Sequence, residues 1–489
     1  MTPKGRFLTK AVVGAAVIGL SLLAGCMVGP NFAKPGAQVP AAWAGPAPSG
    51  PSPSVAASQP ASQPSPAEID LARWWTAFGD PTLTSLVTRA VESNLDLRLA
   101  EARIRQARAA RGVAIAGLGP TVTGTSGYAR GQNGRAPVTN HYQAGFDAGW
   151  ELDIFGGQRR NVEAAEADLS FALEDRRDVL VTLSAEVAGN YVALRAYQQR
   201  LVIARRNLQA QQHSAEIARK RQASGLMASG LDVANADAQV AGTASAIPLL
   251  EMAARQTIYS LGVLLDREPA ALAEQLSPAG AIPASNMTVP LGVPSDLLRR
   301  RPDIRRAEAD IHAATARIGV ATADLYPHVT ISGSLGFQAS DLRDWLSPVS
   351  RFWSFGPGVT WSAFNTGANL ARIDIQKALA DQTVLSYRKT VLTAMQEVEN
   401  ALIAAAKEQE HRKALVDAVA ANRKAVDLST RLYSQGETEF LNVLTAQRSL
   451  LATEDALADS ERAKSTDLIA LYKALGGGWQ EADKPDEKP

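Results

Sequence analysis

Five histidines are the side chains of this sequence best suited to proton transfer or metal binding, and they are scattered: His141, His213, His312, His328 and His411. No two of them stand at the spacing of metal ligands. The sequence contains no Gly-x-Ser-x-Gly nucleophile motif, no phosphate-binding loop and no dinucleotide glycine fingerprint. Asp and Glu are numerous, but they stand among Arg and Lys on helix-forming segments, which is typical of solvated helix faces. We therefore expect no enzymatic activity, no cofactor and no metal site.

Cys26 is the only cysteine, and its surroundings predict a covalent modification. It follows a basic N-terminus and an apolar run over residues 11–23, which is too short for a membrane-spanning helix of about 20 residues. The Leu-Ala-Gly at 23–25 resembles the bacterial lipobox, in which the cysteine thiol is diacylated and becomes the mature N-terminus. An ordinary cleavage site with an incidental cysteine is the alternative. We predict a lipoprotein signal peptide over residues 1–25, and Met27 in place of Asp favours the outer membrane by resemblance to the sorting rule.

Composition describes the remainder of the chain. Residues 26–67 are rich in Pro, Ala and Ser, which predicts a tether between the lipid and a folded body. The 50 Lys and Arg nearly balance the 49 Asp and Glu, so charge gives no reason to expect a nucleic acid partner. Beyond residue 70 the composition is uniform and rich in Ala, Leu, Arg, Glu and Gln, as in long helices. Residues 476–489 are predicted to be a charged C-terminal tail.

The folded body consists of two versions of one unit, which we place at residues 68–290 and 291–475. Residues 94–117 match residues 301–324 at a constant offset and without a gap. Chance similarity between two Ala-rich helices would not keep glycine and proline in register. The matched pairs include Gly112/Gly319, Leu118/Leu325, Pro120/Pro327 and Val122/Val329.

In each repeat this helix leads into a pair of alternating segments, over residues 119–154 and 327–364. Strands of about 10–13 residues are long enough to cross a bilayer, because tilted membrane strands need about 9–11 residues. A soluble hairpin would show the same alternation. The alternation alone therefore leaves both interpretations open.

A long helix follows each strand pair, over residues 157–224 and 367–435. Neither range contains a proline, and each helix would be about 100 Å long at 1.5 Å per residue. Both end at a glycine turn, and shorter return helices are predicted over residues 231–265 and 441–475. Two long helical hairpins therefore extend to one side of the strands.

Four strands cannot stand alone in lipid, because their edges leave backbone groups without hydrogen bonds. Two chains would give an eight-stranded barrel filled by side chains, and three would give a twelve-stranded barrel with a pore. We prefer the trimer. The predicted fold is therefore mostly α with a transmembrane β part, in which four strands per chain form a twelve-stranded barrel continued by a long α-helical barrel.

Two motifs resemble a known family. The run Trp-Glu-Leu-Asp-Ile-Phe-Gly at 150–156 looks like a strand-to-helix junction of the outer membrane efflux proteins of the TolC-like class, in their NodT/OprM-type lipoprotein branch. The run Pro-Ser-Asp-Leu-Leu-Arg-Arg-Arg-Pro-Asp-Ile at 294–304 looks like the most specific signature of that branch. The resemblance implies a homotrimeric channel-tunnel of the Gram-negative outer membrane that extends into the periplasm. It also implies a periplasmic adaptor and an inner-membrane pump, commonly of the resistance-nodulation-division type, as partners.

The resemblance further assigns roles to residues at the two glycine turns, where the adaptor docks and the tunnel closes until docking opens it. The docking positions are Gly225, Leu226, Ser229, Leu231, Gly436, Glu437, Phe440 and Leu441. The gate positions are Tyr433, Asn442, Thr445 and Arg448. Asn442 and Thr445 stand where many members carry an acidic residue, and plain helix packing is the alternative for Tyr433 and Arg448.

The strand-to-helix junctions are expected at Phe155 and Gly157 and, in the second repeat, at Phe364 and Gly367. We expect the two glycines to permit the change of backbone direction without Cβ strain.

The implied function is passive conduction of small molecules, drugs and toxic organics among them, out of the cell. Two alternatives stay open: the outer-membrane component of a type I protein secretion system, and a non-channel coiled-coil lipoprotein of the envelope. The second would need neither strand pairs nor a duplicated junction.

Overall fold

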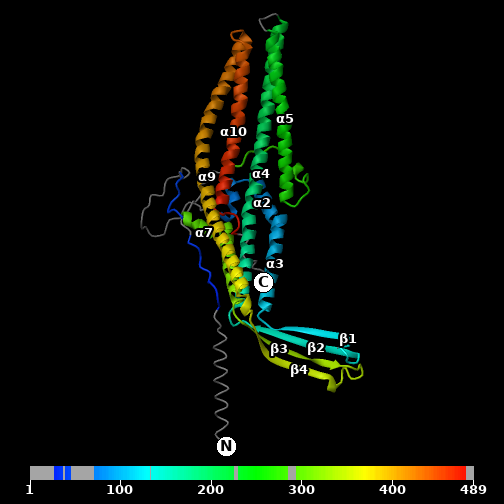
Figure 1. Cartoon of the computed structure of the whole chain (residues 1–489). Coiled ribbons are helices and arrows are strands. Elements are labelled where there is room, and N and C mark those ends of the chain that lie inside the picture. The colour runs from blue at the N-terminus through cyan, green and yellow to red at the C-terminus, as the bar shows by residue number, and fades with distance from the viewer. Residues whose placement is uncertain are drawn as a thin grey trace. The chain divides into compact units, whose positions relative to one another are not determined.

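The computed structural model of this chain describes residues 27–36, 39–45, 71–132, 134–224, 229–284 and 293–480. Helices predominate among them, and the strands form one four-stranded sheet (Figure 1). This confirms the mostly helical class that the sequence predicted.

Both halves of the chain show the same order of elements: a helix, two strands, a long helix and a return helix. In the first half these are α3 (Leu95–Ala116), β1 (Thr121–Gly131), β2 (Thr139–Leu152), α4 (Gly157–Ala223) and α5 (Gly230–Leu264). In the second they are α8 (Pro302–Ala323), β3 (His328–Ala339), β4 (Arg351–Thr360), α9 (Thr366–Gln435) and α10 (Phe440–Ala474). The shorter elements are η1 (Leu71–Phe78), α2 (Pro81–Ser93), α6 (Ala273–Leu276), η2 (Pro294–Asp296), α7 (Leu297–Arg300), η3 (Pro348–Ser350) and η4 (Ala363–Asn365).

Asn94 separates α2 from α3. Its backbone is extended, with φ −56° and ψ 136°, and its side-chain oxygen accepts the N–H of Asp96 at 2.9 Å. Its amide nitrogen donates to the carbonyl of Leu264 at 2.9 Å. The local hydrogen bonds of an asparagine side chain thus compete with the helix and end it.

The described residues form two compact units, each built from both halves of the chain. The first unit lies within Met1–Ala37, Ala102–Glu174 and Arg305–Thr390 and holds the sheet. The second lies within Gln38–Glu101, Asp175–Ile304 and Val391–Pro489 and holds the helical hairpins.

In the first unit, the opening part of α4 packs along α8 through a row of ion pairs. Asp168 accepts both hydrogen bonds of Arg317, at 2.6 and 2.7 Å, and Glu163 lies 3.0 Å from His312 Nε2. Farther along, Glu174 is 2.6 Å from Arg305. The helices approach so closely that a side chain at Gly157 would meet the Cβ of Ala323 at 2.9 Å. Small residues and paired charges therefore hold together the two helices that adjoin the sheet.

The sheet has the order β1-β2-β3-β4, with every neighbouring pair antiparallel. Because opposite residues in such a ladder share a face, the register sorts the side chains into two sets. One face is apolar and its large side chains are exposed: Val122, Tyr128, Phe146, Trp150, Leu335, Trp353, Phe355 and Val359. The other is polar and carries Thr121, Thr123, Thr125, Gln143, Asp147, Ser332, Ser334, Gln338 and Ser354. β1 and β4 leave their outer edges unpaired within the described chain.

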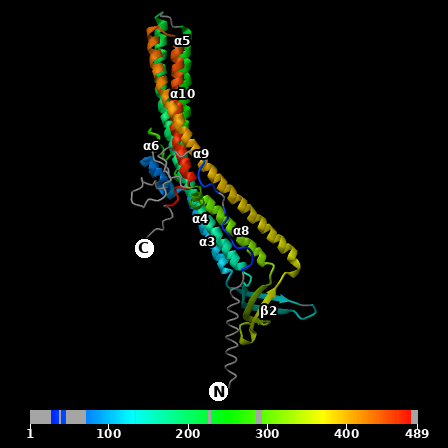
Figure 2. The same ribbon diagram turned by 90° about the vertical axis from the view of Figure 1, so that its left-hand side faces the viewer.

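In the second unit, α4 runs beside α5 and α9 beside α10, as Figures 1 and 2 show. Arg205 of α4 is paired with Glu251 of α5 at 2.7 Å. Away from the turns the core is mostly aliphatic and includes an aromatic pair, Trp74 stacked on Tyr472 at a ring distance of 5.2 Å. Burial raises the pKa of Tyr472 to about 12.

A buried carboxylate ties three of these helices together. Glu454 of α10 is 4% exposed and accepts hydrogen bonds from Asn207, Arg206 and Arg423 at 2.6–3.1 Å. Burial acts to raise the pKa of Glu454, but the hydrogen bonds from Asn207 and the two arginines outweigh it, and the pKa is lowered. The charged form is therefore the stable one in the folded bundle.

The run at 294–304 contributes a second buried charge cluster. Arg301 is 8% exposed and binds Asp303 through two hydrogen bonds of 2.7 and 3.0 Å. It also donates to Glu397 of α9 at 2.7 Å and to the carbonyl of Ala474 at 2.9 Å. Burial acts to lower the pKa of Arg301, and its partners Asp303 and Glu397 more than compensate, so the pKa is raised. Arg301 thus links the start of α8 to α9 and to the end of α10.

Candidate functional site

The turn between α9 and α10 is built around Gly436. Its φ of 83° lies in the left-handed region that glycine adopts without strain. The N–H of Glu437 donates to the carbonyl of Leu432 at 2.9 Å, and that of Gly436 donates to Tyr433 at 3.1 Å. This pair of bonds is the Schellman motif, which ends α9 and satisfies its last carbonyl groups.

The start of α5 is fixed by a capping box. The N–H of Asp232 donates to the hydroxyl of Ser229 at 3.3 Å, and the N–H of Ser229 donates to the Asp232 carboxylate at 3.1 Å. The predicted docking residues Gly225 and Leu226 lie outside the described residues.

Beside these turns the four long helices share one apolar cluster, which we call the tip cluster. It consists of Ala215, Ala218, Ala236, Tyr433, Phe440, Val443 and Leu444. Tyr433 and Phe440 are 4% and 2% exposed, and their ring centroids are 5.2 Å apart. Leu231 and Leu441 point outward instead and are more than half exposed. Of the predicted docking residues, Phe440 therefore lies in the interior, whereas Ser229, Leu231, Gly436, Glu437 and Leu441 are exposed.

The four predicted gate residues do not form one cluster. Tyr433 is inside the tip cluster, and its hydroxyl has no hydrogen-bond partner in the described part of the chain. The other three lie exposed on α10: Asn442 donates to Thr438 at 2.7 Å, Thr445 donates to the carbonyl of Leu441, and Arg448 donates to Gln239 of α5 at 2.6 Å.

The sequence analysis assigned no role to two residues beside Tyr433, namely Arg221 and Asp232. The guanidinium of Arg221, at the end of α4, lies 4.6 Å from the centre of the Tyr433 ring and donates to the Tyr433 carbonyl. Burial raises the pKa of Tyr433, the carboxylate of Asp232 raises it further, and Arg221 opposes both. The position of Arg221 in the sequence could have indicated a role at the turn, because Arg221 precedes the first turn glycine much as Tyr433 precedes the second.

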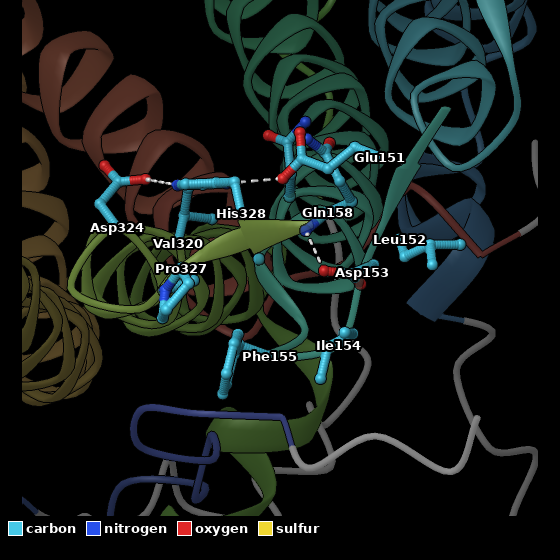
Figure 3. Close-up of a pocket in the computed structure, with 13 residues that line it drawn as sticks. Glu151, Leu152, Asp153, Ile154, Phe155, Gln158, Val320, Asp324, Pro327 and His328 are labelled. Carbon is cyan, nitrogen blue, oxygen red and sulfur yellow. Dashed lines mark hydrogen bonds and ion pairs between the residues drawn. The ribbon is translucent and has the colours of Figure 1, made fainter. Parts of the chain in front are cut away.

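At the first strand-to-helix junction the change of direction occurs at Gly156, with a φ of 80°, and not at the predicted Gly157. Gly157 is the first residue of α4. Asp153 caps the helix by accepting the N–H of Gln158 at 3.0 Å (Figure 3) and that of Arg159 at 3.0 Å. Of two adjacent glycines, the one outside the helix thus adopts the left-handed conformation, because the next already has helical angles.

The second junction is built differently, and the expectation for Gly367 was wrong. Gly367 lies inside α9 and does not have a positive φ. Phe364, expected at the end of a strand, is in η4 and is fully exposed. The 3₁₀ turn, in which Asn365 donates to the carbonyl of Ser362 at 3.0 Å, redirects the chain without a left-handed residue.

Two tryptophans at the base of the sheet are held in the same way in both repeats. The indole N–H of Trp150 donates to the carbonyl of Leu118 at 2.9 Å. That of Trp361 donates to the carbonyl of Leu325 at 3.1 Å. Leu118 and Leu325 are one of the pairs matched in the sequence, so the repeat extends to individual hydrogen bonds.

A pocket of about 240 Å³ with both polar and apolar lining lies where β2, β3, α4 and α8 meet (Figure 3). His328 stands in it with Nδ1 2.7 Å from Glu151 and Nε2 4.0 Å from Asp324. No group of three or more His, Cys, Asp or Glu within the described residues could hold a metal ion. The arrangement links the start of β3 to the end of β2 and to α8.

Residues 27–36, which we call the N-terminal strap, lie against this junction. The N–H of Val28 donates to the carbonyl of Phe155 at 3.1 Å, and a side chain at Gly156 would meet the Cα of Met27 at 2.8 Å. Arg160 of α4 is 1% exposed and binds Asn31 at 2.6 Å as well as the Val28 carbonyl at 3.2 Å. Cys26 itself lies outside the described residues.

No helix among the residues that the structure describes is long and apolar enough to cross a membrane.

Comparison with known proteins identifies the class. A family profile described as outer membrane efflux protein matches residues 86–265 and 293–477. Nodulation protein T of Rhizobium leguminosarum bv. trifolii is 33% identical over 472 residues, which cover 95% of this chain and 97% of that protein. The pyoverdine export outer membrane protein OpmQ of Pseudomonas aeruginosa is 33% identical over 84% of this chain and 88% of its own length. The solved outer-membrane channel OprN has a TM-score of 0.84 at 38% identity, over 93% of this chain and 100% of that one.

The fold and these similarities define an outer-membrane channel protein. The chain belongs to the outer membrane efflux protein family. It is an efflux component of the outer membrane that extends into the periplasm, as the sequence motifs indicated.

Proposed function

We propose that this protein is the exit duct of a tripartite efflux system. As a homotrimer it would passively conduct small organic molecules that an inner-membrane pump of the resistance-nodulation-division class and a periplasmic adaptor deliver. Relatives named for toluene efflux, antibiotic efflux and pyoverdine export support small molecules over secreted proteins as cargo.

The observation that carries the proposal is the sheet. Its apolar face exposes Trp353, Phe355 and Val359, each at 68% or more, and β1 and β4 have free edges in the described chain. Lipid cannot satisfy the backbone groups of those edges, so they must pair with the edges of other chains. Three copies close a twelve-stranded barrel with the apolar face toward lipid and the polar face around a lumen.

The helical hairpins would continue this lumen as an α-helical barrel through the periplasm. We assign adaptor docking to the turn positions Gly225 and Leu226 and to the exposed residues Ser229, Leu231, Gly436, Glu437 and Leu441. Phe440, which is buried, shapes this surface by supporting the tip cluster. Tyr433, Asn442, Thr445 and Arg448 are the proposed gate, and docking opens it by shifting the helices that the tip cluster joins.

The division of the chain follows from these roles. Residues 1–25 are the proposed signal peptide, 26–67 the lipidated tether, 68–290 and 291–475 the two repeats, and 476–489 the tail.

Acylation of Cys26 would anchor the chain. We expect Cys26→Ser to abolish acyl incorporation and to move the protein out of the outer-membrane fraction, and unchanged fractionation would contradict the anchor.

Two measurements test the duct. Purified protein is expected to run as a trimer that heat converts to a monomer. Deleting the gene for this protein and deleting the gene for its pump are expected to give the same profile of drug sensitivity, because both remove one pathway. Protein that runs as a monomer before heating, or unequal profiles of drug sensitivity, would count against a dedicated tripartite duct.

A further inference from the structure

We infer that Asp147 makes the β-barrel part of the duct selective for cations. This inference rests on the proposed function, because it requires three copies of the sheet around one lumen. It concerns the sheet alone and is independent of the gate at the helical turns.

Asp147 lies on the polar face, half-way along β2. It is directly opposite Thr123 of β1 and Ser334 of β3, and it is exposed. The hydroxyl of Thr125 donates to Asp147 at 3.4 Å. An open pocket beside β1 and β2 is lined in part by Asp147, Gln143 and His141 of the polar face. The carboxylate therefore faces the space that three sheets would enclose.

Within the part of the chain that the structure describes, no Lys, Arg or His pairs with this carboxylate. The other carboxylate on the polar face, Glu151, is paired with His328 at 2.7 Å. The remaining side chains of that face are Thr, Ser, Gln, His and small or aromatic residues, without Lys or Arg. The described polar face therefore carries carboxylates and no Lys or Arg, and Asp147 is its negative charge half-way along the strands.

Threefold symmetry would place three Asp147 carboxylates at one height of the lumen. A ring of like charges lowers the energy of counter-ions in a pore and raises that of co-ions. The barrel would thus pass cationic and neutral solutes more readily than anionic ones. The tip residues Asn442 and Thr445 are uncharged, so the ring at Asp147 can be tested without interference from carboxylates at those positions.

The test is the reversal potential of purified trimer in planar bilayers under a KCl gradient. Asp147→Asn removes the charge at almost constant volume, and Asp147→Glu keeps it as a matched control. We expect the potassium-to-chloride permeability ratio to fall about threefold or more in the Asn variant at 0.1 M salt. The fall should shrink at 1 M, where the Debye length is about 3 Å instead of about 10 Å. The Glu variant should keep the wild-type ratio.

A gain of charge completes the experiment. Ser334→Asp adds a carboxylate directly opposite Asp147 and should raise the ratio above that of the wild type. Conducting Asn and Ser334→Asp variants that both keep the wild-type ratio would overturn the role of Asp147 and leave the duct intact. Folded trimers that conduct nothing even after truncation of the hairpin tips that hold the gate would instead refute the proposed function itself.

Discussion

The N-terminal strap should detach when its clamp, Arg160, is removed. The guanidinium is 1% exposed and holds the strap through Asn31 at 2.6 Å and through the carbonyls of Val28 and Gly29 at 3.2 and 3.4 Å. A hydrogen bond to a charged group contributes about 1.5–3 kcal/mol. The two carbonyl contacts are long, so we take about 2–3 kcal/mol for the set. Arg160→Met keeps an apolar stem beside Gly319 and loses these bonds.

The amide of Val28 reports this change directly, because it donates to the carbonyl of Phe155 in the docked strap. A loss of about 2–3 kcal/mol corresponds to about 30- to 150-fold faster hydrogen exchange if the amide exchanges by local opening. Lys34→Ala is the matched control, since Lys34 is 62% exposed and its pair with Glu308 contributes about 0–1 kcal/mol. Exchange at Val28 that is equally slow in wild type and Arg160→Met would refute the clamp.

Three further predictions concern the helical hairpins. Gly436→Pro should weaken adaptor crosslinking at the turn, because proline cannot adopt a φ of 83° and lacks the N–H that ends α9; undiminished crosslinking would remove the docking assignment. Tyr433→Phe alone should leave conductance unchanged, since the hydroxyl has no partner in the described chain, whereas adding Arg448→Ser should raise the open fraction; identical recordings from wild type and double variant would leave the gate without support. The pKa of Glu454 is lowered in the fold, so its charged form stabilises the bundle above its unfolded pKa of about 4.5, and this contribution is lost as pH falls through the folded pKa; Glu454→Gln should flatten that part of a melting-temperature profile.

Local signals in the sequence located most of the fold. Long stretches without proline predicted α4 and α9, and the glycine at 436 marked the end of α9. The alternation of side chains placed all the strands, although β4 ends at Thr360 and not at 364. These features depend on neighbours in the chain, so periodicity and turn residues reveal them.

Contacts between distant segments could not be read in this way. Arg301 meets Glu397, 96 positions away, and Arg221 meets Tyr433, 212 positions away. Among candidate tip residues, an exposed leucine and the buried Phe440 look alike in sequence, because only the packing of four helices decides which side chain is covered. The choice between two adjacent glycines at the first junction depends likewise on where the helix begins.

The exit-duct account is tested most directly by the electrical conductance of the purified, folded trimer in a planar lipid bilayer. The account predicts stepwise currents of one unit size per inserted trimer, because three sheets enclose a continuous polar lumen. A folded trimer that enters the bilayer and carries no current at any voltage, even after truncation of the hairpin tips that hold the gate, would contradict it.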